Sequence, residues 1–357
     1  MFDSDQYQLL DFGNGRRLER FGPVILDRPC PAADGIVPAN PEAWQTADAR
    51  FQGRNEDKGQ WVCRSELPER WTIAHGGLRF ELKGTNFGHL GLFPEQAENW
   101  DWIAHVMSSL SLLPGEGQVE GKHTSPLPLG EGQGEGGSES TVALSSPHPL
   151  PLSRLRARGD PIKVLNLFAY TGGSTLAAAI CGAEVTHVDA ARNIVAWARR
   201  NAELSGLTGA PIRWITEDAV RFVKRELKRG RGYDAVILDP PSYGHGPRGE
   251  VWRLSKHLPR LLAMCGELTA GGPKFMLLTC HTPGYDPTAL AQMVQEALGT
   301  AGSCTAQALT IRAATGAKLP SGIVVRWTPP QSPLRAPTEG WSGEGEGEGG
   351  HNTFVDP

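Results

Sequence analysis

The sequence lacks the features that mark metal ribbons, disulfide frameworks and membrane proteins. Its six cysteines are scattered and form no Cys-x-x-Cys pair, so neither a zinc site nor a disulfide framework is indicated. No window reaches the roughly 18 apolar residues that span a bilayer, and the start of the chain lacks a basic segment followed by an apolar run. We therefore expect a cytoplasmic protein with no membrane partner and no metal.

Proline and glycine are abundant, and they gather in two stretches of low complexity. The 357 residues include 44 glycines and 28 prolines. The stretches run from Pro114 to Ser153 and from Pro329 onward, and both offer too little apolar surface to offset the entropy of ordering. The predicted division is a small β-rich module over 1–85, a lid or connecting helix over 86–113, a disordered insertion over 114–160, an α/β domain over 161–328 and a disordered tail over 329–357.

Charge is unevenly distributed along the chain. The formal net charge is -4, but Arg154 to Arg260 holds 18 Lys and Arg against 10 Asp and Glu, a local excess of 18 - 10 = +8. A solvated helix face is the commoner reason for such a run, and contact with phosphates is the other. Charge alone leaves both open.

Short strands are expected in the first hundred residues. The segment Tyr7 to Phe12 alternates apolar with polar residues, Asn14-Gly15 is a strong hairpin signal, and Arg16 to Phe21 can pair back. A second hairpin is expected around His75-Gly76-Gly77. A helix from about Glu95 to Leu113 follows, with apolar residues at helical spacing.

Between the two low-complexity stretches, five apolar strands alternate with amphipathic helices, which predicts a doubly wound, mostly parallel sheet. Two further runs, Thr305 to Ile311 and Gly322 to Trp327, would add an antiparallel pair and bring the total to seven strands. The five strands are expected at Lys163–Leu167, Glu184–Val188, Ile212–Thr216, Asp234–Leu238 and Lys274–Thr279, with helices near Ser174–Cys181, Ala191–Leu204, Ala219–Arg229, Leu254–Leu268 and Thr288–Gly299.

Polar and glycine residues follow the strands, at the edge where ligands of such sheets bind. Gly172 and Gly173 allow a tight turn after the first strand. Asp189 is placed to accept both hydroxyls of a ribose, while Asp218 can accept from an adenine amino group or merely cap a helix. After the fourth strand, Asp239-Pro240-Pro241 forms a rigid wall. The glycine fingerprint of dinucleotide enzymes is absent from the first turn.

The run Val164–Gly173, followed by Val188-Asp189 and Asp239–Pro241, resembles the S-adenosylmethionine (SAM)-dependent 23S rRNA methyltransferase family, whose best-known members methylate cytosine at C5. The resemblance covers about Phe87 to Trp327 apart from the insertion. It implies a class I methyltransferase fold, SAM as cofactor and RNA, most often ribosomal, as partner. The implied cofactor-binding residues are Phe168, Tyr170, Thr171, Gly172, Gly173, Asp189, Asp218, Asp239 and Pro240, with Phe93 and Gln96 on a segment that closes over the cofactor.

The resemblance also implies a catalytic role for Cys280, which ends the fifth strand where cytosine-specific members carry their cysteine. C5 of cytosine is a poor nucleophile, and addition of a thiolate at C6 makes it reactive. His281 could lower the pKa of the thiol or relay a proton, and Asp239 would hydrogen-bond or protonate the ring edge. Without the resemblance, a structural cysteine is the more ordinary interpretation.

Two departures from the family pattern keep alternatives open. Ser242 stands where many cytosine C5 enzymes carry a second cysteine, which excludes a two-cysteine mechanism, and residues 1–80 do not match the family's larger RNA-binding module. Asp239–Pro241 followed by Tyr243 also suits methylation of a guanine or adenine nitrogen. A non-catalytic SAM-binding protein that serves RNA binding or assembly is the third possibility.

Overall fold

The computed structural model describes residues 1–53, 58–112, 160–246 and 249–330. Residues 114–159 of the predicted insertion over 114–160 and residues 331–357 of the predicted tail over 329–357 lie outside the described residues. Within the described ranges, none of the helices has both the length and the apolar character needed to cross a membrane. The same ranges contain no group of three or more His, Cys, Asp or Glu side chains arranged to hold a metal ion.

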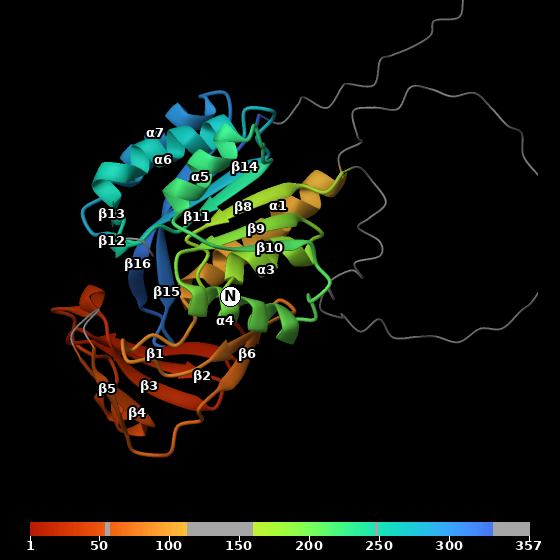
Figure 1. Cartoon of the computed structure of the whole chain (residues 1–357). Helices are drawn as coiled ribbons and strands as arrows, with labels where there is room; N and C mark the ends of the chain where they lie inside the picture. The colour runs from red at the N-terminus through yellow and green to blue at the C-terminus, as the bar shows by residue number, and fades with distance from the viewer. Residues whose placement is uncertain (54–57, 113–159, 247–248, 331–357) are drawn as a thin grey trace, which may run out of the picture.

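A seven-stranded sheet forms the centre of the second half of the chain (Figure 1), in the order β10-β9-β8-β11-β14-β16-β15. The first five strands of that order pair in parallel, and β16 and β15 pair antiparallel. The predicted doubly wound sheet with an antiparallel end is thus confirmed. The strands are β8 (Lys163–Leu167), β9 (Glu184–Asp189), β10 (Ile212–Thr216), β11 (Ala235–Leu238), β14 (Phe275–Cys280), β15 (Ser303–Arg312) and β16 (Lys318–Thr328).

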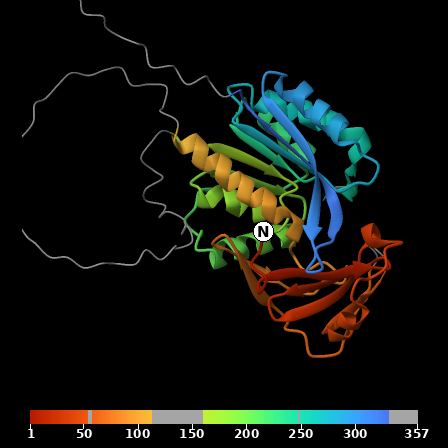
Figure 2. The ribbon, with the colours of Figure 1, turned by 180° about the vertical axis from the view of Figure 1, so that it is seen from behind.

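Helices cover both faces of this sheet. One face carries α1 (Ala97–Leu112), α3 (Gly173–Ile180) and α4 (Arg192–Leu204), and the other carries α5 (Ala219–Lys228), α6 (Leu254–Leu268) and α7 (Pro287–Leu298) (Figures 1 and 2). Every residue of β11 and β14 is buried, as expected for central parallel strands covered on both faces. The predicted helix α1 begins at Ala97 rather than Glu95, because the short 3-10 helix η3 (Pro94–Gln96) precedes it.

The first residues form a separate five-stranded sheet. Its strands are β1 (Tyr7–Gly13), β2 (Arg16–Phe21), β3 (Val24–Pro29), β4 (Ala49–Gln52) and β5 (Gln60–Cys63), with short 3-10 helices at Pro31–Ala33 and Pro41–Thr46. The predicted hairpin turn is confirmed, since Asn14 and Gly15 have φ of 51° and 70°, the backbone that Asn-Gly favours. The strands β3 to β5 were not predicted from the sequence.

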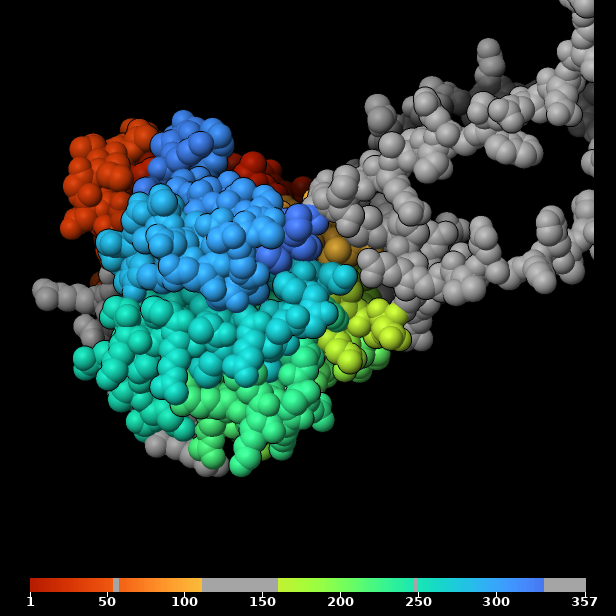
Figure 3. All heavy atoms as spheres, turned by 90° about the horizontal axis from the view of Figure 1, so that it is seen from above, coloured from red at the N-terminus to blue at the C-terminus, as the bar shows by residue number. Residues whose placement is uncertain are grey.

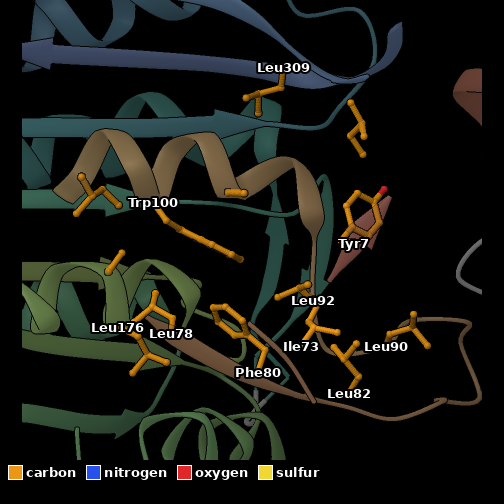
Figure 4. Packing of buried hydrophobic residues seen from close by; sticks show 14 of the residues in the cluster. Tyr7, Ile73, Leu78, Phe80, Leu82, Leu90, Leu92, Trp100, Leu176 and Leu309 are labelled. Carbon is orange, nitrogen blue, oxygen red and sulfur yellow. The ribbon is translucent and has the colours of Figure 1, made fainter. Parts of the chain in front are cut away.

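The second predicted hairpin, β6 (Trp71–His75) and β7 (Leu78–Leu82), does not join the five-stranded sheet. It lies along α4, where Trp197 Nε1 donates to the Glu81 carbonyl at 2.9 Å. Its apolar side chains point into a core shared with α1 and α3 (Figure 4), and Phe80 stacks on Trp100 with ring centroids 4.9 Å apart. The hairpin therefore ties the N-terminal segment to the flank of the large sheet.

The β15–β16 pair extends beyond the large sheet to reach the N-terminal sheet (Figure 2). At its turn, Ala314 N donates to the Leu9 carbonyl at 2.7 Å. Seen from above in Figure 3, the cyan and blue residues of the second half make one continuous surface with the red N-terminal residues beside it. The same apolar cluster holds Tyr7 of β1 and Val324 of β16, so the two sheets share a core.

Gly173 tests the packing of the first turn against α1. A Cβ at this position would lie 2.4 Å from the Trp100 ring, so we expect Gly173→Ala to destabilise the chain by about 1–3 kcal/mol through overpacking. The measurement is the urea midpoint at constant m-value. Gly209→Ala is the control, because no heavy atom lies within 4 Å of its Cβ position. Equal midpoints for the two variants would contradict the close approach.

Candidate active site

The turn after β8 is held in a strained backbone conformation. Phe168 and Tyr170 have φ of 55° and 48°, and Gly172 has φ of 92°. Aromatic residues rarely adopt positive φ, at a cost of about 1–3 kcal/mol each, and such strain gathers at functional sites. Asp189 holds the turn in place, because its Oδ2 accepts from Tyr170 N at 3.0 Å. Because Asp189 is the last residue of β9, this hydrogen bond ties the turn after β8 to β9.

The two carboxylates that follow β9 and β10 have different surroundings. The half-buried Asp189 also accepts from Ala191 N, at 2.9 Å through Oδ1, and burial raises its pKa despite these backbone hydrogen bonds. Each of its oxygens retains a further lone pair, so the predicted ribose contact remains available. Asp218 caps α5 by accepting from Arg221 N at 2.9 Å. The ribose and adenine contacts stay predictions.

The segment containing Phe93 and Gln96 lies directly on the strained turn. Thr171 Oγ1 donates to the Gly91 carbonyl at 2.7 Å, and the rings of Phe93 and Tyr170 have centroids 5.1 Å apart. Residues 91–96 and the turn at 168–172 are far apart in the sequence but pack against each other through these contacts. The predicted lid role requires this contact and stays a prediction.

Asp239 is the centre of a polar cluster at the carboxyl ends of β11 and β14. Its Oδ2 accepts from Gln96 Nε2 at 3.0 Å, and its Oδ1 accepts from Thr279 Oγ1 and faces His281 Nε2 at 3.2 Å. Burial raises the pKa of Asp239, but the His281 charge and these hydrogen bonds outweigh it and lower the pKa below its ordinary value. Asp239 is therefore an ionised carboxylate at neutral pH.

The same contacts set the charge of His281. Burial lowers its pKa, but the Asp239 carboxylate more than compensates and raises it to about 9. Its Nδ1 lies 2.7 Å from the Ser321 carbonyl, so both ring nitrogens face acceptors. His281 is an imidazolium at neutral pH and has no free lone pair.

Comparison with known proteins agrees with this arrangement. A family model described as S-adenosylmethionine-dependent methyltransferase matches residues 153–297. The crystal structure of a SAM-dependent methyltransferase from Agrobacterium tumefaciens is 33% identical, has a TM-score of 0.73, and aligns over 91% of this chain and 90% of that one. The chain belongs to the SAM-dependent methyltransferases.

Other relatives agree at the level of fold or of one segment. A putative SAM-dependent methyltransferase from Streptococcus mutans shares the fold, with a TM-score of 0.61 at 15% identity over 90% of this chain and 75% of that one. A protein named ribosomal RNA large subunit methyltransferase K/L from Shewanella frigidimarina is 36% identical over 122 residues. That match covers 31% of this chain and only 17% of the relative's length.

The site of this methyltransferase fits SAM. The strained turn at 168–172 lies beside Asp189, and the half-buried carboxylate retains acceptor capacity for ribose hydroxyls. Phe168, Tyr170, Gly172 and Asp189 are the residues that would hold the cofactor, which supplies an electrophilic methyl group when bound. The predicted use of SAM is confirmed by the family, and its individual contacts stay predictions.

Cys280 ends β14, one residue beyond Thr279 and on the opposite face of the strand. It is 1% exposed within the apolar cluster on the α6 side of the sheet, and its Sγ lies 4.0 Å from the Thr282 carbonyl. The expectation that His281 lowers the pKa of this thiol is wrong. Burial raises the pKa of Cys280, and the negative Asp239 adds to that effect, because His281 directs both nitrogens elsewhere.

A hairpin that was not predicted from the sequence packs against Asp239-Pro240-Pro241. Strands β12 (Tyr243–His245) and β13 (Val251–Arg253) pair antiparallel. From β13, Trp252 Nε1 donates to the Pro241 carbonyl at 2.6 Å and its ring lies 4.9 Å from that of Phe168. Trp252 therefore links the turn after β8 to the wall after β11. The tryptophan that follows Asp-Pro-Pro in the sequence was the one feature that could have indicated this contact.

The ion pair of His281 can be tested by titration. In wild-type protein, the His281 ring should titrate with a pKa of about 9. In Asp239→Asn the stabilising charge is lost, so the pKa should fall to about 6.5 or lower. The measurement is the pH dependence of the ring proton shifts by NMR. His105, which lies in α1 away from the Asp239 cluster, is an internal reference, and a wild-type His281 midpoint near 6.5 would contradict the ion pair.

Proposed function

We propose that this methyltransferase acts on RNA, and specifically on ribosomal RNA at C5 of a cytosine, with Cys280 as the nucleophile. The observation that carries the proposal is the placement of Asp239 and Cys280. Leu238 of β11 pairs in register with Leu278 of β14, so Asp239, which follows β11, and Cys280, which ends β14, lie at the sheet edge where ligands bind. The name of the ribosomal RNA relatives supports the class of substrate.

The proposed reaction has three steps. The Cys280 thiol releases its proton to water and its sulfur bonds to C6 of the cytosine, which places an electron pair at C5. C5 would then take the methyl group that SAM, held by the turn after β8 and by Asp189, would supply. Finally the C5 proton is removed and the bond between sulfur and C6 breaks. In this cluster Asp239 is the group able to accept a proton, because His281 already holds one.

The ionised state of Asp239 also defines how it holds the base. A carboxylate only accepts hydrogen bonds, so Asp239 accepts from the exocyclic amino group of cytosine rather than protonating the ring. The target base has to leave its stack to reach this edge of the sheet.

A pocket of about 420 Å³ beside the active site supports an anionic substrate. It lies between α5, α6 and the β12–β13 hairpin, and its lining includes Arg221, Lys224, Glu250 and Arg260. Arg221 lies between two carboxylates, those of Glu217 and Glu250. Among the residues that the structure describes, no carboxylate lies within 4.0 Å of the Lys224 or Arg260 charge. Two unneutralised cations from separate helices thus converge where an RNA phosphate would lie.

Methylation of a base nitrogen is the second candidate, and one observation favours it. Tyr243, just after Asp-Pro-Pro-Ser, is 50% exposed, whereas Cys280 is 1% exposed and its thiol has a raised pKa. An exposed aromatic ring can stack on a flipped base. Nitrogen methylation would use Asp239 and Tyr243 without any covalent intermediate.

Replacement of the cysteine separates the two candidates. For C5 methylation, Cys280→Ala should lower kcat at least about a thousandfold, roughly 4 kcal/mol of barrier. SAM affinity by calorimetry should stay within a factor of a few. Wild-type enzyme should form an adduct with RNA containing 5-fluorocytosine that survives denaturing electrophoresis, because fluorine is not eliminated as the proton is. An active Cys280→Ala variant that matches wild type, with no adduct on an RNA that is methylated, would favour nitrogen methylation.

Charge reversal tests the pocket. Lys224→Glu and Arg260→Glu should each weaken RNA binding and reduce the dependence of log K on log salt by about 0.7–0.9 per lost phosphate contact. Fluorescence anisotropy at several salt concentrations measures both quantities. Lys274→Glu is the control, since this exposed residue lies at the amino end of β14, away from the ligand edge. The same loss in all three variants would indicate a general charge effect and count against the pocket.

A further inference from the structure

A chain of buried polar side chains ends at Asp239. Arg326 Nη2 of β16 donates to Asn99 Oδ1 of α1 at 2.8 Å, and Asn99 Nδ2 donates to Gln96 Oε1 at 2.8 Å. Gln96 Nε2 then donates to Asp239 Oδ2 at 3.0 Å. Asn99 is 0% and Gln96 6% exposed. Apolar side chains would fill this space without the risk of unpaired polar groups, so the network calls for a reason beyond packing.

The two ends of the chain fix the orientation of both amides. Arg326 can only donate, so Asn99 must turn its oxygen toward it and its NH2 toward Gln96. The Asp239 carboxylate can only accept, so Gln96 must turn its NH2 toward Asp239 and its oxygen toward Asn99. A rotated amide at either position would set two donors or two acceptors against each other. The network thus presents a donor at Gln96 beside an acceptor at Asp239.

Gln96 has a second N–H that lacks a good partner. Its other contacts are to Thr279 Oγ1 and His281 Nε2, both at 3.4 Å, longer than an ordinary N–H···O hydrogen bond. His281 does not accept, because its two nitrogens already face the Asp239 carboxylate and the Ser321 carbonyl. A nearly buried donor without a good acceptor is costly, so this N–H points to an acceptor that a ligand supplies.

We propose that Gln96 reads the target base, with its NH2 group and the Asp239 carboxylate forming an adjacent donor and acceptor. This pair matches a base edge that has an amino group next to a ring nitrogen with a lone pair. Cytosine and adenine have that pair on the Watson–Crick edge, whereas on the same edge uracil and guanine present a carbonyl oxygen next to a ring N–H. Asn99 and Arg326 are positioning residues that hold Gln96 in the required orientation. The inference rests on the proposed function and deepens it, because it assigns Gln96 to the base rather than to SAM.

The test compares two RNAs that differ at one position. The probes are a short RNA carrying the mapped target cytosine and the same RNA with uracil there, since C5 of uracil is open to the same cysteine chemistry. The wild-type ratio of kcat/KM for cytosine over uracil should fall at least about tenfold in Gln96→Glu, where the donor becomes an acceptor. Asn99→Asp should lower the same ratio, because Gln96 then turns its NH2 away from the base. Gln295→Glu, the same exchange of amide for carboxylate in α7 outside this network, is the matched control and should keep the wild-type ratio.

A substrate-side measurement covers the case in which Asn99→Asp does not fold. RNA with 3-deazacytosine lacks the ring acceptor, so wild-type enzyme should methylate it more slowly than RNA with cytosine. In Gln96→Leu the difference in rate between the two RNAs should be smaller, because the contact between Gln96 and the ring nitrogen is already lost. An unchanged base ratio in Gln96→Glu, together with weakened SAM binding, would overturn the inference and return Gln96 to the cofactor. A wild-type chain that methylates no RNA would overturn the proposed function as well, so the two failures are distinguishable.

Discussion

The in-register pairing of β8, β11 and β14 is the constraint on which the site depends. Leu167, Leu238 and Leu278 are level across the three strands, so the residues that follow them emerge at one edge. Those residues include the strained aromatic turn and Asp239. Because every residue of β11 and β14 is buried between two helical layers, a slip in register would disrupt the packing on both faces as well as separate the functional groups.

The N-terminal part of the chain contributes to the site because its last segment runs directly from the β6–β7 hairpin into the site. The β6–β7 hairpin is bound to α4. The chain then passes over the strained turn at 168–172, which Gly91 contacts, before it enters η3 and α1. The β15–β16 pair meets the N-terminal sheet at Leu9 and also supplies Arg326 to the interior. Distant segments are thus joined at Gln96, whose amide contacts both Asn99 of α1 and Asp239.

The sequence predicted local and periodic features better than contacts between distant segments. The strands and helices of the large sheet follow from apolar periodicity, and the turn at Asn14-Gly15 follows from backbone preference. The pairing of β3 with β4 is parallel and spans a long loop, so no local signal marks it. The contact of Gln96 with Asp239 joins residues 143 apart, and only the fold brings them together. Asn99 is a polar residue three positions after Gln96 on an otherwise apolar helix face. Its position indicated a buried polar contact, but the spacing alone did not identify the partners.

The resting state of Cys280 is consistent with a nucleophile that becomes reactive only when substrate is present. Reactive cysteines usually have a low pKa and an exposed position, which also makes them prone to oxidation. Cys280 has the opposite features, since it is buried and its thiol has a raised pKa beside the negative Asp239. A base that donates its amino group to Asp239 would draw off part of that negative charge and so favour the thiolate at the moment when C6 is in reach. In the proposed reaction, the contact that holds the base therefore also lowers the cost of forming the Cys280 thiolate that attacks it.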